Sequence, residues 1–454
     1  MKHSKRINKK KPSYLLYSFI SLFLVLLIGL GFILYKRVFS NPDSYTSSTS
    51  SNPTDEPANL TIEDATFRKN LLEKAELLAK GYDYDGAIKL IKDNENYQDY
   101  PDLTAAIDNY NSEKSTLVQA DITKIDHVFF HPLVYDTTTA WSSDMASAYN
   151  CAMTTTTEFT NMMQQMYDKG YVLVSMHDMA TVNSDGKMTQ GKIMLPKGKI
   201  PFVLSVDDVN YYRKWYKKGI ADKLIVGEDG LVTCEATKAD GSKITGAFDV
   251  APLLDEFIAK HPDFSYKGAR GILAVTGYEG IYGYRTSARD SENTEPIESE
   301  KEKVIEVIKA LAAGGWDFAS HSWGHLDLKS IPYEKFKADT DRWETEVRQI
   351  FEAANVKVDI ILYPFGADVG SWQTYIGNER FNYLKSKGFS YFCNVDCTQP
   401  WVQFNGDAGY LRQGRINLDG YNMKTRPNSL TKYFDVNSVI DKTRPDNMDQ
   451  YGSY

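Results

Sequence analysis

The feature that most constrains the fold is an alternation of short apolar runs with helical patterns, which extends from residue 122 to the end of the chain. The apolar runs have the length of buried strands, and helical segments separate many of them. The candidate strands are residues 127–131, 171–175, 202–206, 271–275, 317–320, 359–363 and 390–394. The candidate helices are residues 156–169, 252–260, 298–313, 333–354 and 376–388. This alternation predicts an α/β fold with a parallel sheet or barrel, in which the chemistry lies at the carboxyl ends of the strands.

Composition favours a globular protein and argues against one that binds nucleic acid. Apolar residues make up 42% of the 454 residues, which is enough for a sizeable core. The net charge is −8, and no stripe of basic residues occurs beyond the first 40 positions. Because proteins bind phosphate backbones through clustered Lys and Arg, a nucleic-acid partner is disfavoured.

The N-terminal region contains one long uncharged run, which predicts a transmembrane anchor at residues 14–35. As a helix, these 22 residues match the thickness of a hydrocarbon core. Six basic residues precede the run and only Lys36 and Arg37 follow it, which predicts a cytoplasmic basic tail at residues 1–13. A cleaved signal peptide is the alternative, but the run is longer than a signal-peptide core and no small-residue cleavage site follows. We therefore expect a single-pass protein of the cell membrane, in contact with the lipid bilayer, whose catalytic domain is extracellular.

Two further segments separate this run from the α/β region. Residues 36–60 are rich in Ser, Thr, Pro and Asn without periodicity, which predicts a flexible linker. Residues 61–115 contain a helical pair whose Gly81, Tyr84 and Ala87 have the spacing of a tetratricopeptide hairpin. One such unit buries its own faces poorly, so we interpret it as a stalk or docking element for a protein partner.

Short segments at the predicted strand ends carry side chains suited to catalysis or metal binding. They contain His131, the adjacent Asp207 and Asp208, the pair His321 and His325, and a tight turn at residues 364–366. Adjacent carboxylates can act separately as ligand and base, and His residues at i and i+4 project to one side of a helical turn. Each segment alone also has an ordinary interpretation, as an acidic loop, a capping and packing pair, a core His or a plain turn.

Together and in this order, the four segments resemble the motifs of the NodB-type polysaccharide deacetylases of carbohydrate esterase family 4. Ser205 to Val209 is similar to the T-F-D-D-G segment, and His321 to His325 to the H-[ST]-x-x-H segment. Tyr363 to Gly366 is similar to the R-x-P-Y-G-like segment. His131 is similar to the N-terminal His of the poly-N-acetylglucosamine deacetylase branch, which this chain resembles most closely.

The resemblance implies a fold, a metal and a division of roles. The fold would be a distorted (β/α) barrel of NodB type at residues 122–454, with an insertion at residues 219–285. The roles implied are metal ligation by Asp208, His321 and His325, general-base catalysis by Asp207, proton donation by His131, and oxyanion stabilisation by the backbone N–H of Phe365. A mixed Asp and His ligand set suits one divalent ion, zinc first, with nickel, cobalt and manganese left open.

The chain departs from the family pattern at three positions, of which the first, Val206 in place of Phe, is a harmless change. Val209 stands where the family has Gly, which restricts the backbone there. Leu362 stands where the family has the Arg that orients the base, and Arg415 in the late segment QGRINL is our candidate substitute.

The function that the resemblance implies is hydrolysis of a carbon–nitrogen bond other than a peptide bond. The substrate would be the N-acetyl groups of an N-acetylglucosamine-containing polysaccharide, either cell-wall peptidoglycan or an exopolysaccharide. Candidate substrate-binding residues are Trp323, Tyr363 and Trp401, with a Tyr- and Gly-rich loop, TGYEGIYGYRT, expected near the cleft. Two alternatives are an O-acetyl esterase of the xylan type and a catalytically silent glycan-binding protein.

Overall fold

The computed structural model describes residues 62, 64–290, 292–396 and 399–446. The chain divides into two units, Met1–Ser47 and Ser48–Tyr454, and the first lies wholly outside the described residues. The predicted basic tail, the uncharged run at 14–35 and the linker at 36–60 also lie outside them.

The described structure does not support the predicted membrane localisation. Within the described residues, no helix is both long enough and apolar enough to cross a bilayer. The longest helix in that part of the chain, α10 at Ile297–Ala313, has 17 residues and carries acidic side chains in its first turn. Such helices bury one apolar face against a protein core and keep their charges in water. The single-pass topology, its bilayer contact and the extracellular placement are therefore not supported.

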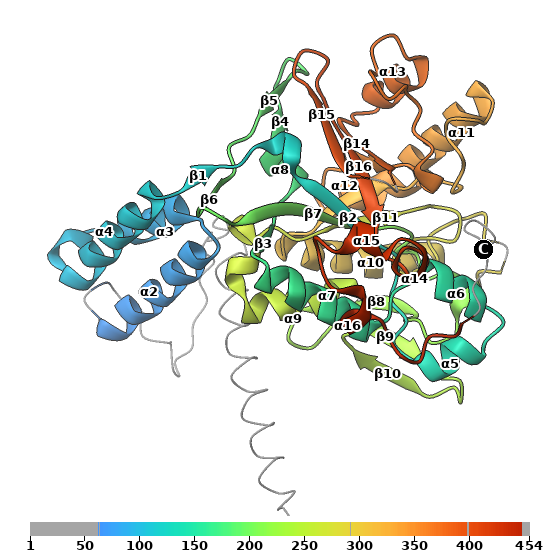
Figure 1. Cartoon of the computed structure of the whole chain (residues 1–454), viewed down its shortest axis with the longest axis horizontal. Coiled ribbons are helices and arrows are strands. Elements are labelled where there is room, and N and C mark those ends of the chain that lie inside the picture. Colours follow the sequence, from blue (N-terminus) through green and yellow to red (C-terminus); the bar gives the residue numbers. More distant parts are fainter. Residues whose placement is uncertain (1–61, 63, 291, 397–398, 447–454) are drawn as a thin grey trace, which may run out of the picture. The chain divides into compact units, whose positions relative to one another are not determined.

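The core of the fold is a closed barrel of parallel strands (Figure 1). Its strands follow one another around the ring in the order β11, β12, β13, β14, β16, β2 and β7, and β7 pairs with β11 to close it. Their bounds are β2 Asp126–Phe130, β7 Ile200–Val206, β11 Ile272–Val275, β12 Asp317–Ser320, β13 Ile360–Leu362, β14 Tyr391–Val395 and β16 Tyr410–Asn417. The predicted (β/α) barrel is thus confirmed, and the predicted strand at 171–175 forms β3, Tyr171–Leu173, which pairs with β7 outside the ring.

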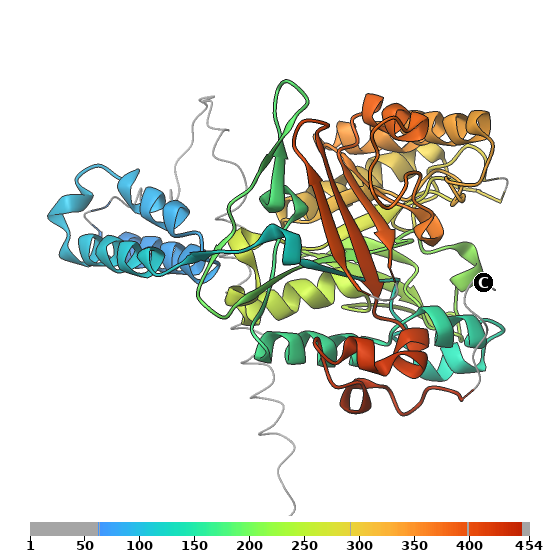
Figure 2. The same cartoon turned by 45° about the horizontal axis from the view of Figure 1, so that its top comes forward.

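Helices and short strands surround this barrel. The helices beside α10 are α5 Thr137–Ser142, α6 Ala146–Ala152, α7 Thr156–Asp168, α8 Met176–Met179, α9 Val250–Lys260, α11 Tyr333–Trp343, α12 Gln349–Ala353, α13 Glu379–Ser386, α14 Gly420–Thr425, α15 Pro427–Leu430 and α16 Val436–Val439. The short strands are β1 Val118–Gln119, β4 Ala180–Val182, β5 Met188–Gln190, β6 Met194–Leu195 and β15 Trp401–Asn405. Figure 2 shows the red C-terminal helices beside the teal α6, and α14 contacts α6 directly.

The predicted insertion, residues 219–285, has bounds that extend too far, because they include a strand of the barrel. A three-stranded antiparallel sheet occupies its first part, with β8 Lys223–Val226, β9 Val232–Thr237 and β10 Lys243–Gly246. The rest contains α9 and the barrel strand β11, whose Val275 pairs with Ser320 of β12. Strand β11 belongs to the barrel because it closes the ring by pairing with β7.

The predicted helical stalk forms three helices rather than a pair. They are α2 Ala65–Lys80, α3 Tyr84–Lys92 and α4 Pro101–Ser115, drawn in blue in Figure 1. Buried Leu71, Ile91 and Leu103 lie in their shared core. Contacts to the barrel domain run through Tyr82, whose hydroxyl donates to the carbonyl of Asp263 at 2.8 Å. The third helix thus covers faces that a lone hairpin would expose. That these helices bind a protein partner remains a prediction.

Strand register decides which side chains meet at the carboxyl ends of the barrel. Phe130 of β2 pairs with Val206 of β7, so the residues that follow, His131 and Asp207, leave the sheet at the same level. Ser320 of β12 pairs with Val275 of β11, so His321 leaves the barrel at the same end. Residues far apart in the sequence therefore converge at one rim.

Candidate metal centre and active site

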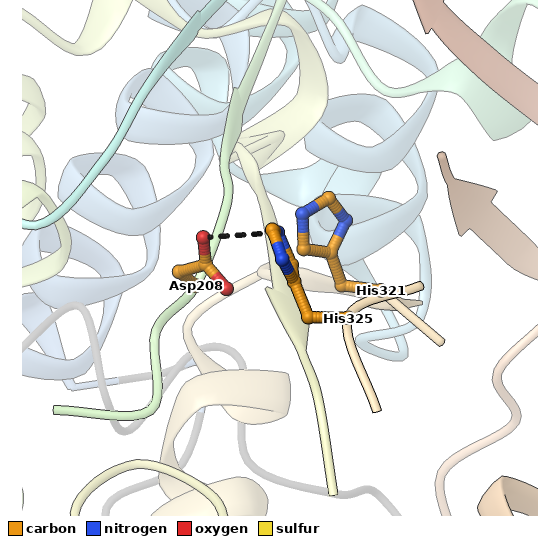
Figure 3. A group of neighbouring side chains, drawn as sticks. All are labelled: Asp208, His321 and His325. Atoms are coloured by element: carbon orange, nitrogen blue, oxygen red, sulfur yellow. Dashed lines mark ion pairs between the residues drawn. The ribbon is translucent and has the colours of Figure 1, made fainter. Parts of the chain in front are cut away.

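Asp208, His321 and His325 form a cluster at this rim (Figure 3). Each offers one ligand atom, and these atoms all lie within 4.8 Å of one another. Nε2 of His325 is 3.6 Å from Oδ2 of Asp208, the contact drawn as a dashed line. The carboxylate and the two imidazoles thus face a common point, as the ligands of one ion must.

The hydrogen bonds of these side chains fit a divalent metal ion. Nδ1 of His321 lies 2.7 Å from the carbonyl oxygen of Leu362. A carbonyl only accepts, so Nδ1 carries the proton and Nε2 keeps its lone pair for a ligand. Burial lowers the pKa of His321, which favours this neutral form. The hydroxyl of Tyr212 donates to Oδ1 of Asp208 at 2.5 Å, which fixes the carboxylate while Oδ2 faces His325.

The loops that carry these residues have an unusual backbone. Asp208, Ser322, His325 and Phe365 all have φ between 51° and 57°, in the left-handed region that residues other than Gly rarely adopt. Such conformations cost about 1–3 kcal/mol each and persist where the surrounding structure holds them. The left-handed residue in the acidic turn is Asp208 and not Val209, so the absence of the family's Gly at position 209 is accommodated.

Asp207 is buried and forms a bidentate ion pair with Arg415. Nη1 of Arg415 lies 2.7 Å from Oδ1 of Asp207, and Nη2 lies 2.9 Å from Oδ2. Burial alone raises the pKa of Asp207, but the charge of Arg415 holds that pKa well below its usual range. The carboxylate is therefore ionised at neutral pH. Arg415 makes the ion pair with Asp207 that we expected of a substitute for the family's Arg. Leu362, at the family's position for that Arg, is buried in the core.

Arg415 itself is held from several sides. It belongs to β16, and Nη1 also contacts the hydroxyl of Ser205 at 3.0 Å while Nε donates to the carbonyl of Asn394 at 3.1 Å. Its guanidinium lies 4.2 Å from the ring centre of Phe129. Such a fixed fork orients the Asp207 carboxylate as well as neutralising it.

His131 follows β2 and lines the same cavity as the acidic pair. Its Nδ1 is buried and has no hydrogen-bond partner within the described residues. Burial lowers the pKa of His131, while the negative charges of Asp207 and Asp208 raise it. A ring nitrogen in this position is free to exchange a hydrogen bond or a proton with a molecule in the cavity.

The cavity above the cluster has a volume of about 320 Å³. Its polar floor is made by Asp207, Asp208, His131, His321 and His325. Its walls are mainly apolar and come from several loops: Phe129, Met145, Ala148, Tyr149, Ala152, Met153, Tyr212, Lys214, Trp215, Tyr278, Phe365, Gly366 and Val395. Phe365 is 65% exposed at the mouth and its ring lies edge-on to His325, with centroids 4.5 Å apart.

The predicted substrate-binding residues do not line this cavity. Tyr363 is fully buried and its hydroxyl contacts that of Tyr375 at 3.1 Å. Trp401 lies on β15 and donates to Asp396 at 3.1 Å. Trp323 lines a neighbouring hollow instead. Tyr363 in particular is corrected to a core residue, because its ring has no surface to offer a sugar.

Tyr212 and Tyr278 also belong to the site, although neither lies in the four motifs that resemble the family. Their rings stack with centroids 5.2 Å apart, and both line the cavity. Tyr278 belongs to the TGYEGIYGYRT loop, which was expected near the cleft. Tyr212 lies four residues after Asp208 and donates a hydrogen bond to that carboxylate, a contact that no motif in the sequence signals.

Fold and site thus define a barrel with a candidate metal centre at its carboxyl-terminal rim. Residues 293–391 match the family model "Polysaccharide deacetylase", which confirms the resemblance to that family. The poly-N-acetylglucosamine branch is not specifically confirmed. The matched segment contains His321 and His325, whereas Asp207, Asp208 and Arg415 lie outside it.

Other comparisons found distant likenesses. No curated protein matches the chain. A structure of the Streptococcus pyogenes deacetylase PplD in complex with acetate has 15% identity and a TM-score of 0.38, and covers 70% of this chain and 99% of that chain. A crystal structure of Puue allantoinase has 17% identity and a TM-score of 0.18, and covers 26% and 35% of the two chains.

Proposed function

We propose that this protein is a metal-dependent hydrolase that removes N-acetyl groups from an N-acetylglucosamine-containing polysaccharide. The observation that carries the proposal is the pairing of buried Asp207 with Arg415 directly beside the Asp208, His321 and His325 cluster. A buried carboxylate that is held ionised in the lining of a cavity favours a catalytic role over a silent glycan-binding protein. The family match supports the same reaction class.

In this proposal the acidic pair has two separate tasks. Asp208, His321 and His325 would hold one divalent ion, and their donor set suits zinc, with nickel, cobalt and manganese compatible. A bound ion of this kind lowers the pKa of water and polarises a carbonyl group. Asp207 would accept the proton of the attacking water, and Arg415 keeps its carboxylate ionised and oriented for that step.

The remaining site residues would act on the acetamide of the substrate. His131, which lines the same cavity as the cluster, would pass a proton to the departing sugar amine. The backbone N–H of Phe365 would stabilise the oxyanion of the tetrahedral intermediate. The apolar walls exclude water from the reacting bond. The products would be acetate and a free amine on the glycan.

The test is acetate release by the full-length protein from N-acetylglucosamine oligomers and from O-acetylated xylan oligomers. We expect release from the first substrate, its loss after chelation, and its return when zinc is added. Faster release from acetylated xylan would favour the O-acetyl esterase. Oligomer binding without acetate release at any metal loading would favour the silent binding protein.

A further inference from the structure

A second hollow adjoins the candidate active site and has a volume of about 410 Å³. We call it the outer hollow, and it is lined by Tyr278, Trp323, Gly324, Leu326, Lys335, Ala338, Asp339 and Arg342. Tyr278 lines both cavities. The backbone N–H groups of Gly277 and Tyr278 donate to the carbonyl of Trp323 at 2.9 and 3.1 Å, so the wall between the cavities is fixed. Because the two cavities share this wall, we expect a polymer with one unit in the catalytic cavity to place its neighbouring unit near the outer hollow.

The lining of the outer hollow carries more positive than negative charge, because it contains the two cations Lys335 and Arg342 and one carboxylate, Asp339. Its one acidic residue, Asp339, already accepts from the backbone N–H groups of Trp323 at 2.9 Å and Gly324 at 2.8 Å. Across the part of the chain that the structure describes, neither Lys335 nor Arg342 forms an ion pair. On the same helix, α11, Lys337 pairs with Glu334 at 3.8 Å.

The position of Arg342 is set by Trp323. The guanidinium carbon lies 4.4 Å from the ring centre of Trp323. The indole is itself held, because Nε1 donates to Glu346 at 2.9 Å and a Cβ on Gly277 would come within 2.3 Å of the ring. The cation therefore stands on a fixed aromatic platform, with its hydrogen-bond donors at the edge of the hollow.

A third cation lies at the catalytic cavity. Lys214 is exposed, lines that cavity, and has its ammonium 5.6 Å from the ring centre of Tyr212. It forms no ion pair with any carboxylate of the described residues. The chain as a whole carries a net charge of −8, so three cations without an ion pair in the linings of these two cavities are not the product of a generally basic surface.

We propose that the outer hollow binds an anionic group, a carboxylate or a phosphate, on the sugar unit next to the acetylated one. Lys335 and Arg342 are its specificity-determining residues, and Lys214 adds to the attraction at the catalytic cavity. The inference rests on the proposed function, since it assigns the substrate class of that site as an anionic acetylated glycan. The guanidinium of Arg342 offers paired donors that either oxyanion can accept.

The first test compares KM for three acetylated oligomers of equal length: neutral, carboxylate-bearing and phosphate-bearing. Wild type should have the lower KM for one or both anionic oligomers, and this preference should weaken as salt is raised. Lys335→Gln and Arg342→Gln should raise that KM about tenfold and leave kcat and the neutral oligomer unchanged. Arg342→Lys, which keeps the charge, should retain part of the preference.

The matched control is Lys337→Gln, which removes a paired lysine from the same helix and should change neither constant. Equal KM values for neutral and anionic oligomers in wild type would overturn the inference. An equal rise in KM for all three oligomers in Arg342→Gln would also overturn it, because Arg342 would then only hold the Trp323 ring in place.

A binding measurement separates this inference from the reaction itself. Titration calorimetry with the anionic oligomers should show weaker binding by Lys335→Gln than by Lys337→Gln, whether or not acetate is released. If wild type releases acetate from no oligomer yet loses anionic binding in Lys335→Gln, the proposed function fails and the anionic site stands. If wild type releases acetate but binds all oligomers alike, the function stands and the anionic site fails.

Discussion

At the scale of single residues, the site depends on a carboxylate kept charged in a buried place. An isolated carboxylate at this depth would take up a proton, and Asp207 avoids this because Arg415 lies against both of its oxygens. The neighbouring Asp208 is turned away by its left-handed backbone and meets Tyr212 and His325 instead. Two adjacent carboxylates thus have different partners, which is the basis for giving them different tasks.

Asp207→Asn should separate the proposed base from the proposed ligands. The amide keeps the shape but accepts no proton, so kcat should fall about 10²–10⁴-fold. Metal content, measured by elemental analysis of the purified protein, should stay unchanged, whereas Asp208→Ala should lose the metal. Full-rate deacetylation by Asp207→Asn would contradict the division of labour.

Arg415→Met tests the partner of that carboxylate. Removal of one member of a buried ion pair leaves the other charge uncompensated, so the free energy of unfolding should fall by about 3–5 kcal/mol. In Arg415→Met with Asp207→Asn, the combined loss measured by urea unfolding should be smaller than the sum of the single losses. Additive losses would show that the two side chains do not depend on each other.

Tyr212→Phe tests support for the metal ligands. It removes the hydroxyl that donates to Asp208 and leaves the ring stacked on Tyr278. Loss of such a supporting hydrogen bond should weaken metal affinity about 10–100-fold, as measured by competition with a chelating dye. Tyr149→Phe is the matched control, since Tyr149 lines the same cavity and its hydroxyl has no hydrogen-bond partner within the described residues. Equal affinity in both variants would reduce Tyr212 to a wall residue.

At the scale of elements, the C-terminal segment holds one wall of the catalytic cavity. Arg444 is buried, pairs with Glu158 of α7 at 2.6 Å, and donates to the carbonyls of Asn150 and Met153 at 2.9 and 2.6 Å. Met153, just after α6, lines the cavity. A side chain from the end of the chain therefore ties α6 to α7 beside the site.

Arg444→Met should destabilise this arrangement. The loss of a buried charge partner predicts a fall of about 3 kcal/mol in the free energy of unfolding, measured in urea. Lys442→Met, an exposed change in the same segment, should cost less than about 0.5 kcal/mol. A similar cost for the two variants would indicate that the segment does not brace α6.

At the scale of the whole molecule, His177 links strands at the amino-terminal end of the barrel. Its two ring nitrogens lie 3.1 Å from Asp317, which begins β12, and 2.9 Å from Asp359, which precedes β13. Burial alone would lower the pKa of His177, but these carboxylates raise it from 6.5 to about 10. The stabilising contribution of protonated His177 is therefore complete below about pH 6.5 and is lost as pH rises through about 10.

His177→Gln should thus lower stability in a pH-dependent way. The imidazole is 37% exposed, so we expect a modest cost of about 1 kcal/mol near pH 6. Urea unfolding of wild type and variant from pH 6 to 10 should show the difference shrinking as pH rises. A difference that stays constant or grows over this range would contradict the protonated bridge.

The sequence by itself determined the features that depend on local pattern. Period and length of the apolar runs predicted the barrel strands from β2 to β14, and helix patterns located α7, α9 and α10 closely. The residues of the candidate metal centre could be named from the sequence because the spacing within a motif is a local property. The helix expected at 333–354 exists, although a π-helical turn at Glu344–Arg348 divides it into α11 and α12.

Only the tertiary structure decided that β16 completes the barrel and which partners its buried polar side chains find. Strand β16 was not predicted, because its Arg412, Gln413 and Arg415 make it look like a solvent-exposed segment. All three are buried because partners from distant strands and loops satisfy them: Asp368 for Arg412, His127 for Gln413 and Asp207 for Arg415. A polar side chain enters a core only when such partners reach it, and that condition is set by the packing of the whole barrel and not by neighbours along the chain.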